Sequence, residues 1–519
     1  MDVIKLVVRL TGFLLRLLWR LLFFILRRLL RLKRKPARKG ASHGSARWAT
    51  CWEQLRHGAL TGEGVILGKG AFGRLLRFSS DGMIMVFAAM GAGKGLGIVI
   101  PALLAYTGSM LVTDPKGENY DITHRKRREY GKVRMLNPAD LAHSDRYNPM
   151  DIIRRGTPME ADDAASLAAL MVKPDARESH WDDKAISLLK ALILHTLSEP
   201  APSRTLANVR RLSIGSPELF KATLTEIADE SPSLAAREIA AGFLTSAGGN
   251  DGSFSTEFSS ILSNVQKATE PWSSGSPGGQ LSQSSTFDLS ELTTETVTLY
   301  LCVDEDLLAT YERWLRVMVG CTLKTLTRAK TKLPKRKVVL LLDEVAILGR
   351  LDVLERQSGI LRAYCTPVLI WQSLNQITKI YGEDAKAFLA NASARVFFGT
   401  NDNDTAHYVA TMVGQTTTYS HSTSNSATFN TSQSRSESGY WLIDPSEVQR
   451  LPLTRIIVKF RNVPYSILGR RIDYRKMRRW RGWWDRWGAS RPSSVPSERL
   501  LLTHEAPQDH GTYAEESAC

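Results

Sequence analysis

The chain has 519 residues, of which 43% are hydrophobic and 23% are charged. This balance is ordinary for a globular protein of two to four domains, and it excludes a mainly disordered chain, a collagen and a bundle of membrane helices. The five cysteines are an odd number without a metal-binding spacing, so we expect reduced thiols in a cytoplasmic setting. The net charge of +16 comes from two basic ends, residues 1–40 and 470–487, because the rest of the chain is nearly neutral.

Residues 1–40 predict a basic amphipathic helix. Six cations recur at gaps of four and seven residues, which places them on one helical face. They are Lys5, Arg9, Arg16, Arg20, Arg27 and Arg31. The other face is apolar, so we expect the helix to lie in a membrane interface on the cytoplasmic side, because a charge at the bilayer centre costs roughly 2.5–3.5 kcal/mol or more. The alternatives are a span whose arginines face water or protein, and a helix packed on protein.

Eight short apolar runs between residues 83 and 460 alternate with helical patterns. They lie at 83–87, 110–113, 133–136, 297–303, 338–342, 367–371, 395–399 and 456–460. Buried parallel strands have this character, so the alternation predicts an α/β fold with a mainly parallel sheet. Between residues 136 and 297 the patterns are helical, for instance at 161–171, 181–197 and 233–244, which predicts an inserted all-α domain.

The strand at 83–87 leads into a loop of small residues and then into a helix that opens with Gly-Lys. Backbone N–H groups in such a loop bind phosphates, and Lys94 would reach the terminal ones. The pattern GxxxxGK[ST] is met imperfectly, since Ala88 replaces the first glycine and Gly95 replaces the Ser/Thr that would ligate Mg²⁺. A glycine-rich turn without a ligand is the alternative. The residues predicted to bind ATP are Ala88, Ala89, Met90, Gly91, Ala92, Gly93, Lys94, Gly95, Leu96 and Asp343.

A second segment supplies the carboxylates that ATP hydrolysis requires. The strand at 338–342 ends in Asp343-Glu344, where Asp343 could hold Mg²⁺ and Glu344 could polarise water for attack on the γ-phosphate. A further strand ends at Gln372, which could sense the γ-phosphate. The turn at 114–118 follows another strand and is expected at the same edge of the sheet, although a plain turn before a helix is the alternative. Together these segments predict nucleotide hydrolysis.

Gly68 to Gly73 match the glycine loop GxGxxG of protein kinases, but the remaining kinase motifs are absent, so we exclude a kinase. Two segments rich in Ser, Thr and Gly, residues 272–285 and 415–439, predict mobile loops. Near the C-terminus Trp480, Trp483, Trp484 and Trp487 follow helical spacing among arginines. They predict a basic helix whose Trp face docks on the body, with nucleic-acid or lipid binding as the alternative. From residue 489 the composition predicts a disordered tail.

Nine motifs occur in an order that resembles the type IV coupling proteins, the ATPases of conjugation and type IV secretion. They are GSARWA (44–49), GKGLGIVIP (93–101), TDPKGE (113–118), YNPMD (147–151), LLDEVAILGRL (341–351), WQSLNQI (371–377), YGEDA (381–385), NDNDTA (401–406) and DPSEVQRLP (444–452). The resemblance covers about residues 44–468. In this family glycine usually follows the P-loop lysine, so Gly95 agrees with it, whereas Ala88 departs from it. The family also normally carries two transmembrane helices, where this chain has one arginine-striped segment.

The resemblance implies a RecA-like nucleotide-binding domain in a homohexameric ring at the cytoplasmic face of the inner membrane. Such a ring would use ATP and Mg²⁺ to move relaxase-bound single-stranded DNA or protein effectors into the channel components of a type IV secretion system. ATP sites in such rings lie between subunits, and Arg362 could supply a neighbour's site with a cation, although a surface arginine is the simpler interpretation. The alternatives are another hexameric DNA translocase, and a membrane-bound adaptor that recruits substrates with little turnover.

The expected domains follow from these segments. They are a membrane-associated helix at 1–40, the first part of the nucleotide-binding domain at 41–159, the all-α domain at 160–275, the second part of the nucleotide-binding domain at 286–468, and a basic Trp-rich helix with a disordered tail at 469–519.

Overall fold

The computed structural model describes residues 43–174, 179–246, 254–329, 334–351, 353–354, 358–425 and 431–488. The predicted N-terminal helix and the predicted tail lie outside these ranges. The chain divides into two compact units, one made of Met1–Trp48 and Asn403–Arg450, the other of Ala49–Asp402 and Leu451–Cys519. Among the described residues, no helix combines the length and the apolar character that a membrane span requires.

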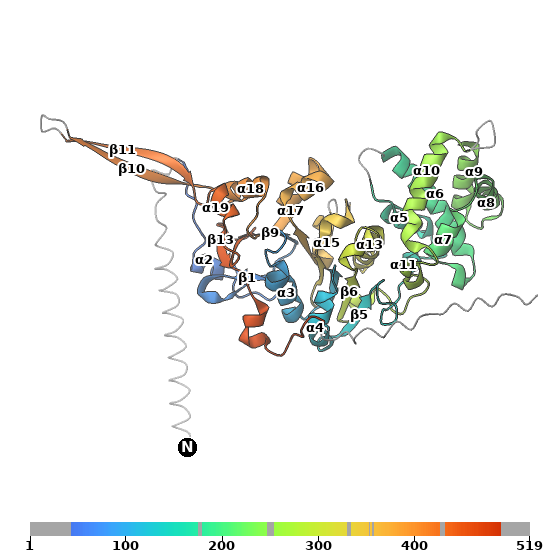
Figure 1. Cartoon of the computed structure of the whole chain (residues 1–519), viewed down its shortest axis with the longest axis horizontal. Coiled ribbons are helices and arrows are strands. Elements are labelled where there is room, and N and C mark those ends of the chain that lie inside the picture. Colours follow the sequence, from blue (N-terminus) through green and yellow to red (C-terminus); the bar gives the residue numbers. More distant parts are fainter. Residues whose placement is uncertain are drawn as a thin grey trace, which may run out of the picture. The chain divides into compact units, whose positions relative to one another are not determined.

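The second unit is organised around an eleven-stranded sheet with the order β2-β1-β13-β12-β9-β3-β8-β7-β4-β6-β5. Figure 1 labels β13, β1, β9, β6 and β5 of this sheet. Every pair from β9 to β5 is parallel, whereas the pairs from β2 to β9 are antiparallel. The strands are β1 (Val65–Lys69), β2 (Leu75–Phe78), β3 (Met83–Phe87), β4 (Met110–Asp114), β5 (Lys132–Leu136), β6 (Val297–Cys302), β7 (Val338–Leu342), β8 (Cys365–Trp371), β9 (Ala392–Phe397), β12 (Arg455–Phe460) and β13 (Ile467–Arg470). The predicted α/β fold with a mainly parallel sheet is therefore confirmed.

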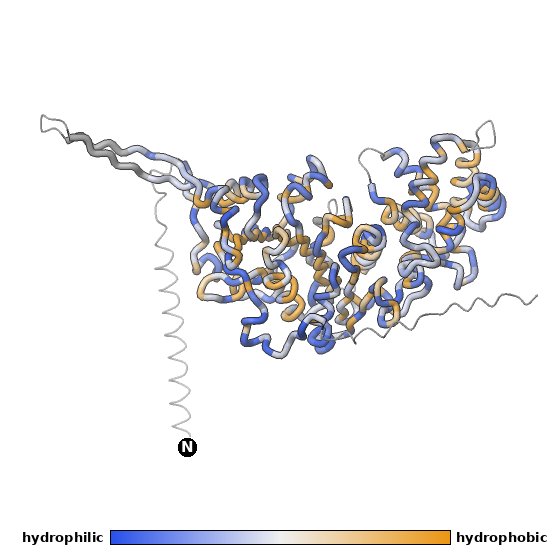
Figure 2. The backbone as a smooth tube through the Cα atoms, in the orientation of Figure 1, coloured by the Kyte–Doolittle hydropathy of each residue, from blue (hydrophilic) through white to orange (hydrophobic). Residues whose placement is uncertain are grey.

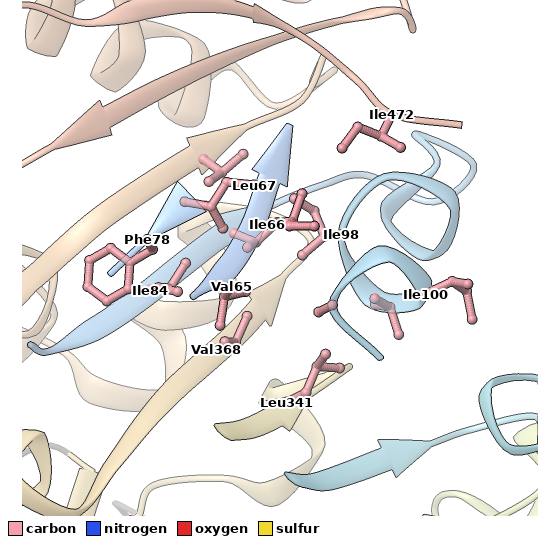
Figure 3. Close-up of a cluster of buried hydrophobic side chains, with 14 of the residues drawn as sticks. Val65, Ile66, Leu67, Phe78, Ile84, Ile98, Ile100, Leu341, Val368 and Ile472 are labelled. Atoms are coloured by element: carbon pink, nitrogen blue, oxygen red, sulfur yellow. The ribbon is translucent and has the colours of Figure 1, made fainter. Parts of the chain in front are cut away.

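Both faces of the central strands are covered. On one face, Ile84, Leu341 and Val368 pack with Ile98 and Ile100, which belong to the helical segment after β3 (Figure 3). Residues of the opposite parity on the same strands are also fully buried, and Phe87 stacks on Phe397 with ring centroids 4.9 Å apart. Burial on both faces explains why these strands read as unbroken apolar runs, and hydrophobic residues follow the sheet strands in Figure 2.

Short and medium helices connect the strands and surround the sheet. In the second unit these helices are α2 (Cys51–Arg56), η2 (Gly95–Val99), α3 (Ile100–Ala105), α4 (Glu118–Arg128), α12 (Glu291–Thr294), α13 (Glu312–Arg328), η7 (Val345–Leu348), α15 (Ser358–Tyr364), α16 (Leu374–Tyr381) and α17 (Asp384–Asn391). Between β5 and β6 the described residues contain helices and no strand. They form α5 (Glu160–Met171), α6 (Ser179–Ser198), α7 (Leu206–Leu212), α8 (Pro217–Glu230), α9 (Leu234–Ser246) and α10 (Thr256–Thr269). Side chains of Thr205, Ser216 and Ser255 cap three of them, which fixes where those helices begin.

Two segments predicted as mobile loops have regular structure, so that prediction is wrong. Residues 272–285 contain α11 (Pro277–Leu281), which is capped by Ser276 and held by the fully buried Trp272. Residues 415–425 and 431–439 belong to a two-stranded antiparallel ladder in the first unit, β10 (Gln415–Asn425) and β11 (Thr431–Trp441). Threonine and tyrosine favour strands, and a hairpin ladder satisfies the backbone without an apolar core.

The first unit adds two helices to this hairpin, α18 (Asn403–Val413) and α19 (Pro445–Gln449). Asp444 caps α19, because its side chain accepts a hydrogen bond from Glu447 N–H. The Glu447 carboxylate in turn accepts a hydrogen bond from the Asp444 backbone N–H. The N-terminal segment of this unit contacts the hairpin, because the Gly44 carbonyl accepts a hydrogen bond from Thr417 N–H of β10 at 3.1 Å. Residues 44–48 of the GSARWA motif and the DPSEVQ motif thus contribute to the same unit.

The predicted helix over the C-terminal tryptophans is also wrong. The chain forms two short 3₁₀ turns, Tyr474–Lys476 and Arg478–Trp480, and Gly482 then adopts a positive φ of 80° that a continuing helix would not allow. Trp480 is nevertheless buried in the core, and the Lys126 ammonium lies 4.0 Å from the ring centroid of Trp483. Trp480, Trp483 and Trp484 pack against the same apolar cluster of the body without forming a helical face, whereas Trp487 is 54% exposed.

Candidate nucleotide-binding site

The glycine-rich loop lies between the carboxyl end of β3 and the start of η2. Ala88 N–H donates to the Trp371 carbonyl at 2.9 Å, which ties the loop to β8. Gly91 and Gly93 adopt positive φ values of 73° and 87°, so the loop needs glycine at these two turns. Successive backbone N–H groups in such turns, next to a helix N-terminus, form a concave site for anions.

The two departures from the common motif leave this loop intact. Ala88 is 1% exposed and its backbone does not adopt the left-handed conformation, so this position does not require glycine. A β-carbon on Gly95 would contact nothing within 4 Å. The space beside Gly95 is therefore open, as a loop that holds phosphates requires.

Lys94 joins the loop to the carboxyl end of β7. Its ammonium lies 2.7 Å from Oδ1 of Asp343 and also contacts Oε1 of Glu344. The Thr113 hydroxyl donates to the Asp343 carbonyl at 2.9 Å, which links the end of β4 to the same place. Residues 250 positions apart thus meet at one edge of the sheet, because the parallel strands carrying them end there.

Burial and neighbouring charges have opposite effects on the pKa values of Lys94 and Asp343. Burial by itself would lower the pKa of Lys94, but the negative charges and hydrogen bonds of Asp343 and Glu344 outweigh it and raise the pKa. Burial raises the pKa of Asp343, and the charge of Lys94 opposes that rise. The lysine is therefore firmly cationic, and its ammonium lies between two carboxylates where a metal cation could compete for the same oxygens.

Glu344 has a backbone conformation that the sequence does not reveal. With φ 52° and ψ 44° it is one of two described non-glycine residues with a positive φ, the other being Phe72. Such a conformation costs of order 1–3 kcal/mol and persists only where neighbours hold it. Here Glu344 N–H donates to Asp343 Oδ1 at 2.9 Å, and its side chain contacts Lys94 and Gln372. The strain points the carboxylate into the site.

Gln372 completes the cluster from the end of β8. Its Nε2 donates to Glu344 Oε2 at 2.8 Å, and its own backbone N–H donates to Oε1 of Gln376 at 2.9 Å. Gln376 lies in the first turn of α16 (Leu374–Tyr381) and was not among the residues that the sequence predicted. A Gln four residues after another Gln at a helix start is the signal that could have found it. The structure thus brings together Lys94, Asp343, Glu344 and Gln372.

Arg362 is not part of this cluster. It lies in α15, before the amino end of β8, whereas Gln372 follows the carboxyl end of that strand. Its backbone carbonyl accepts a hydrogen bond from Lys337, which itself pairs with Asp81. Lys337 and Asp81 precede β7 and β3, so Arg362 lies at the opposite edge of the sheet. Its action on a neighbouring subunit stays a prediction.

The turn after β4 supports the site by holding α4. Asp114 is 1% exposed and accepts hydrogen bonds from Tyr120 N–H at 2.8 Å and from Asn119 Nδ2 at 3.1 Å. Burial raises the pKa of Asp114 to about 7, although the backbone hydrogen bonds of Tyr120, Asn119 and Lys116 oppose the rise. Gly117 with φ 68° then lets the chain enter α4.

We expect Asp114→Asn to change the pH dependence of stability. The folded chain keeps the Asp114 proton up to about pH 7, whereas the unfolded chain releases it near pH 4. The folded state therefore binds more protons between these values, and its stability falls as pH rises through the window. Urea unfolding of both proteins at pH 5 and 8 should show wild type losing roughly 2–3 kcal/mol relative to the variant, about 1.4 kcal/mol for each pH unit between 5 and 7. A constant difference between the two proteins would refute this role of the carboxyl.

The chemistry of these residues fits a magnesium nucleotide. The loop offers left-handed glycines and open space at Gly95, and Lys94 is a cation at its end. Asp343 is a largely buried carboxylate of the kind that binds Mg²⁺ together with phosphates and water. Glu344 has one oxygen on Lys94 and the other on Gln372, so it is oriented by two partners.

A mainly parallel sheet, a glycine-lysine loop after one strand and carboxylates after another define a RecA-like P-loop protein. The family model for type IV secretory system conjugative DNA transfer matches residues 46–498. The chain therefore belongs to this family of coupling proteins, as its motifs predict.

Individual relatives agree with the family. Protein VirD4 of Rhizobium radiobacter is 28% identical over 485 residues, which cover 90% of this chain and 68% of that protein. Conjugal transfer protein TraG of Rhizobium radiobacter is 31% identical over 426 residues, covering 78% of this chain and 63% of that protein. The chain thus spans about two thirds of the length of these relatives.

Solved structures share the fold. The unbound bacterial conjugative coupling protein TrwBdeltaN70 superposes with a TM-score of 0.61 at 16% identity, over 82% of this chain and 94% of that one. Plasmid coupling protein TrwB in complex with ADP and Mg²⁺ gives a TM-score of 0.61 at 15% identity, over 84% and 96%. At these identities the likeness establishes the fold alone, including its RecA-like core.

Proposed function

We propose that the protein is an ATP-hydrolysing coupling protein that drives DNA or protein substrates into a type IV secretion channel. The observation that carries the proposal is the cluster of Lys94, Asp343, Glu344 and Gln372 beside a phosphate-binding loop. Membership of the conjugative DNA transfer family supports the substrate class, and the complex of TrwB with ADP and Mg²⁺ supports the two ligands.

Each residue has a role in this proposal. Residues 88–96 hold the phosphates of ATP, and Lys94 neutralises the terminal ones. Asp343 holds Mg²⁺, which supplies charge at the phosphates. Glu344 orients a water and accepts its proton, and Gln372 positions Glu344 and responds to the γ-phosphate. Arg362 serves the site of a neighbouring subunit in a homohexamer.

The partners follow from the same proposal. Single-stranded DNA with its relaxase, or protein effectors, are the substrates, and the channel components of the secretion system receive them. Residues 1–35 hold the protein at the cytoplasmic face of the inner membrane. We also propose the nucleotide-binding domain at 41–159 and 286–468, with the all-α domain at 160–275 as the part that meets substrates or the channel.

Steady-state ATP hydrolysis by the purified full-length protein, with and without single-stranded DNA, tests the proposal. We expect turnover that requires Mg²⁺ and rises several-fold with DNA, because a translocating ring couples the two. A folded protein that binds ATP but does not turn it over in either condition would instead support the substrate-recruiting adaptor. Turnover stimulated only by double-stranded DNA would favour a different DNA translocase.

A further inference from the structure

Arg471 lies against the glycine-rich loop although it comes nearly 380 positions later in the chain. Its Nη1 donates to the Ala92 carbonyl at 2.9 Å. A β-carbon on Gly93 would overlap this nitrogen, and one on Gly97 would lie 2.8 Å from Cγ of Arg471. The side chain therefore runs along the first turn of η2 and ends at the loop. Arg471 and the two glycines form one packed unit.

The backbone of Arg471 is fixed by its neighbours. Its N–H donates to the Thr454 carbonyl at 2.8 Å, directly after β13. The next residue, Ile472, is fully buried in the same apolar cluster as Ile98 of η2 (Figure 3). The guanidinium thus reaches the loop from a rigid segment of the core, as a residue that positions a ligand requires.

Among the described residues, no carboxylate forms an ion pair with the Arg471 guanidinium. Within the part of the chain that the structure describes, its side chain has one partner, a neutral carbonyl. Lys94, a few residues away along the loop, contacts two carboxylates. A partly buried guanidinium with free donors next to a loop shaped for anions favours a bound anion, and Arg is the side chain that binds phosphate oxygens most directionally.

We propose that Arg471 binds the phosphate chain of the nucleotide within its own subunit. This inference rests on the proposed ATP site and adds a residue from outside the sequence motifs. Arg471 contacts the loop at Ala92, Gly93 and Gly97, and not the carboxylates Asp343 and Glu344, which mark the reacting end. Its phosphate contact is therefore one that ADP and ATP share.

Titration calorimetry with ADP and with the non-hydrolysable analogue ADPNP, both with Mg²⁺, tests the inference on the full-length protein. Arg471→Gln should weaken both nucleotides by roughly 10-fold or more, because a charge-assisted hydrogen bond is lost. The matched control is Arg470→Gln, which alters the adjacent exposed arginine and should leave both affinities within twofold. Equal thermal unfolding midpoints for the two variants keep the comparison valid.

Ionic strength separates binding by charge from a purely structural role. The ratio of the Arg471→Gln and wild-type dissociation constants should shrink as salt rises, because screening weakens a charge contact. A ratio independent of salt would overturn the inference and leave Arg471 as an anchor of the loop. Arg471→Lys keeps the charge without the planar fork, and we expect it to recover part of the affinity.

Gly97→Ala offers a second measurement. The added methyl group would displace the Arg471 side chain, so the variant should weaken ADP binding in the wild-type background and have little further effect in Arg471→Gln. Full additivity would overturn the inference. If wild type binds neither nucleotide, the proposed function falls as well. If wild type binds and Arg471→Gln binds equally well, only the inference about Arg471 falls.

Discussion

Lys94→Ala is expected to lower ATP turnover by at least about 100-fold, because the loss of a preorganised charge at the transferring phosphoryl group costs several kcal/mol. In the structure the Lys94 ammonium lies between Asp343 and Glu344. The variant also leaves two neighbouring carboxylates without their counter-charge. Their negative charge should weaken the binding of nucleotide phosphates in the loop. Steady-state hydrolysis and DNA transfer in a mating assay measure the effect.

Lys379→Ala is a suitable control for this change, since Lys379 is an exposed lysine of α16. Its turnover should match wild type. Lys94→Ala should keep the fold, because the side chain extends from a loop and is not part of the apolar core. Turnover within about twofold of wild type would rule out the P-loop assignment, and loss of folded protein would mark Lys94 as a structural cation.

Glu344→Gln is expected to bind ATP while hydrolysing it about 100- to 10,000-fold more slowly, the range in which general bases contribute. The amide cannot accept the proton of an attacking water. Its oxygen can still accept the hydrogen bond from Gln372 Nε2, and Lys94 keeps Asp343 as its partner. The site should therefore stay assembled while its chemistry is lost.

Calorimetry with ATP and single-turnover hydrolysis separate the two properties. Glu383→Gln, which changes an exposed glutamate on the surface, serves as the matched control. Should Glu344→Gln lose ATP binding together with turnover, Glu344 would be a structural residue that keeps its strained turn in place. A persistent ATP complex would also allow gel filtration to test whether bound ATP favours the hexamer.

The central strands and the loop of this protein are determined locally, which is why the sequence predicts them. The eight predicted strands appear within three residues of their expected bounds. A parallel strand that is buried on both faces is apolar along its whole length. The unbroken apolar runs at 338–342 and 367–371 therefore predict buried strands. The same rule places Lys94, Asp343, Glu344 and Gln372 at one edge, since each follows the carboxyl end of a parallel strand or opens the helix after one.

The tertiary structure decided what depends on distant partners. The strands β2, β1 and β13 at one end of the sheet depend on pairing with one another, and Trp480, Trp483 and Trp484 pack against the body without a continuous helix. The strained backbone of Glu344 exists because Lys94 and Gln372 hold its side chain. Arg471 reaches the loop only because Ile472 is anchored in the core beside Ile98. Local periodicity carries no information about such contacts, because they arise from packing between separate segments of the chain.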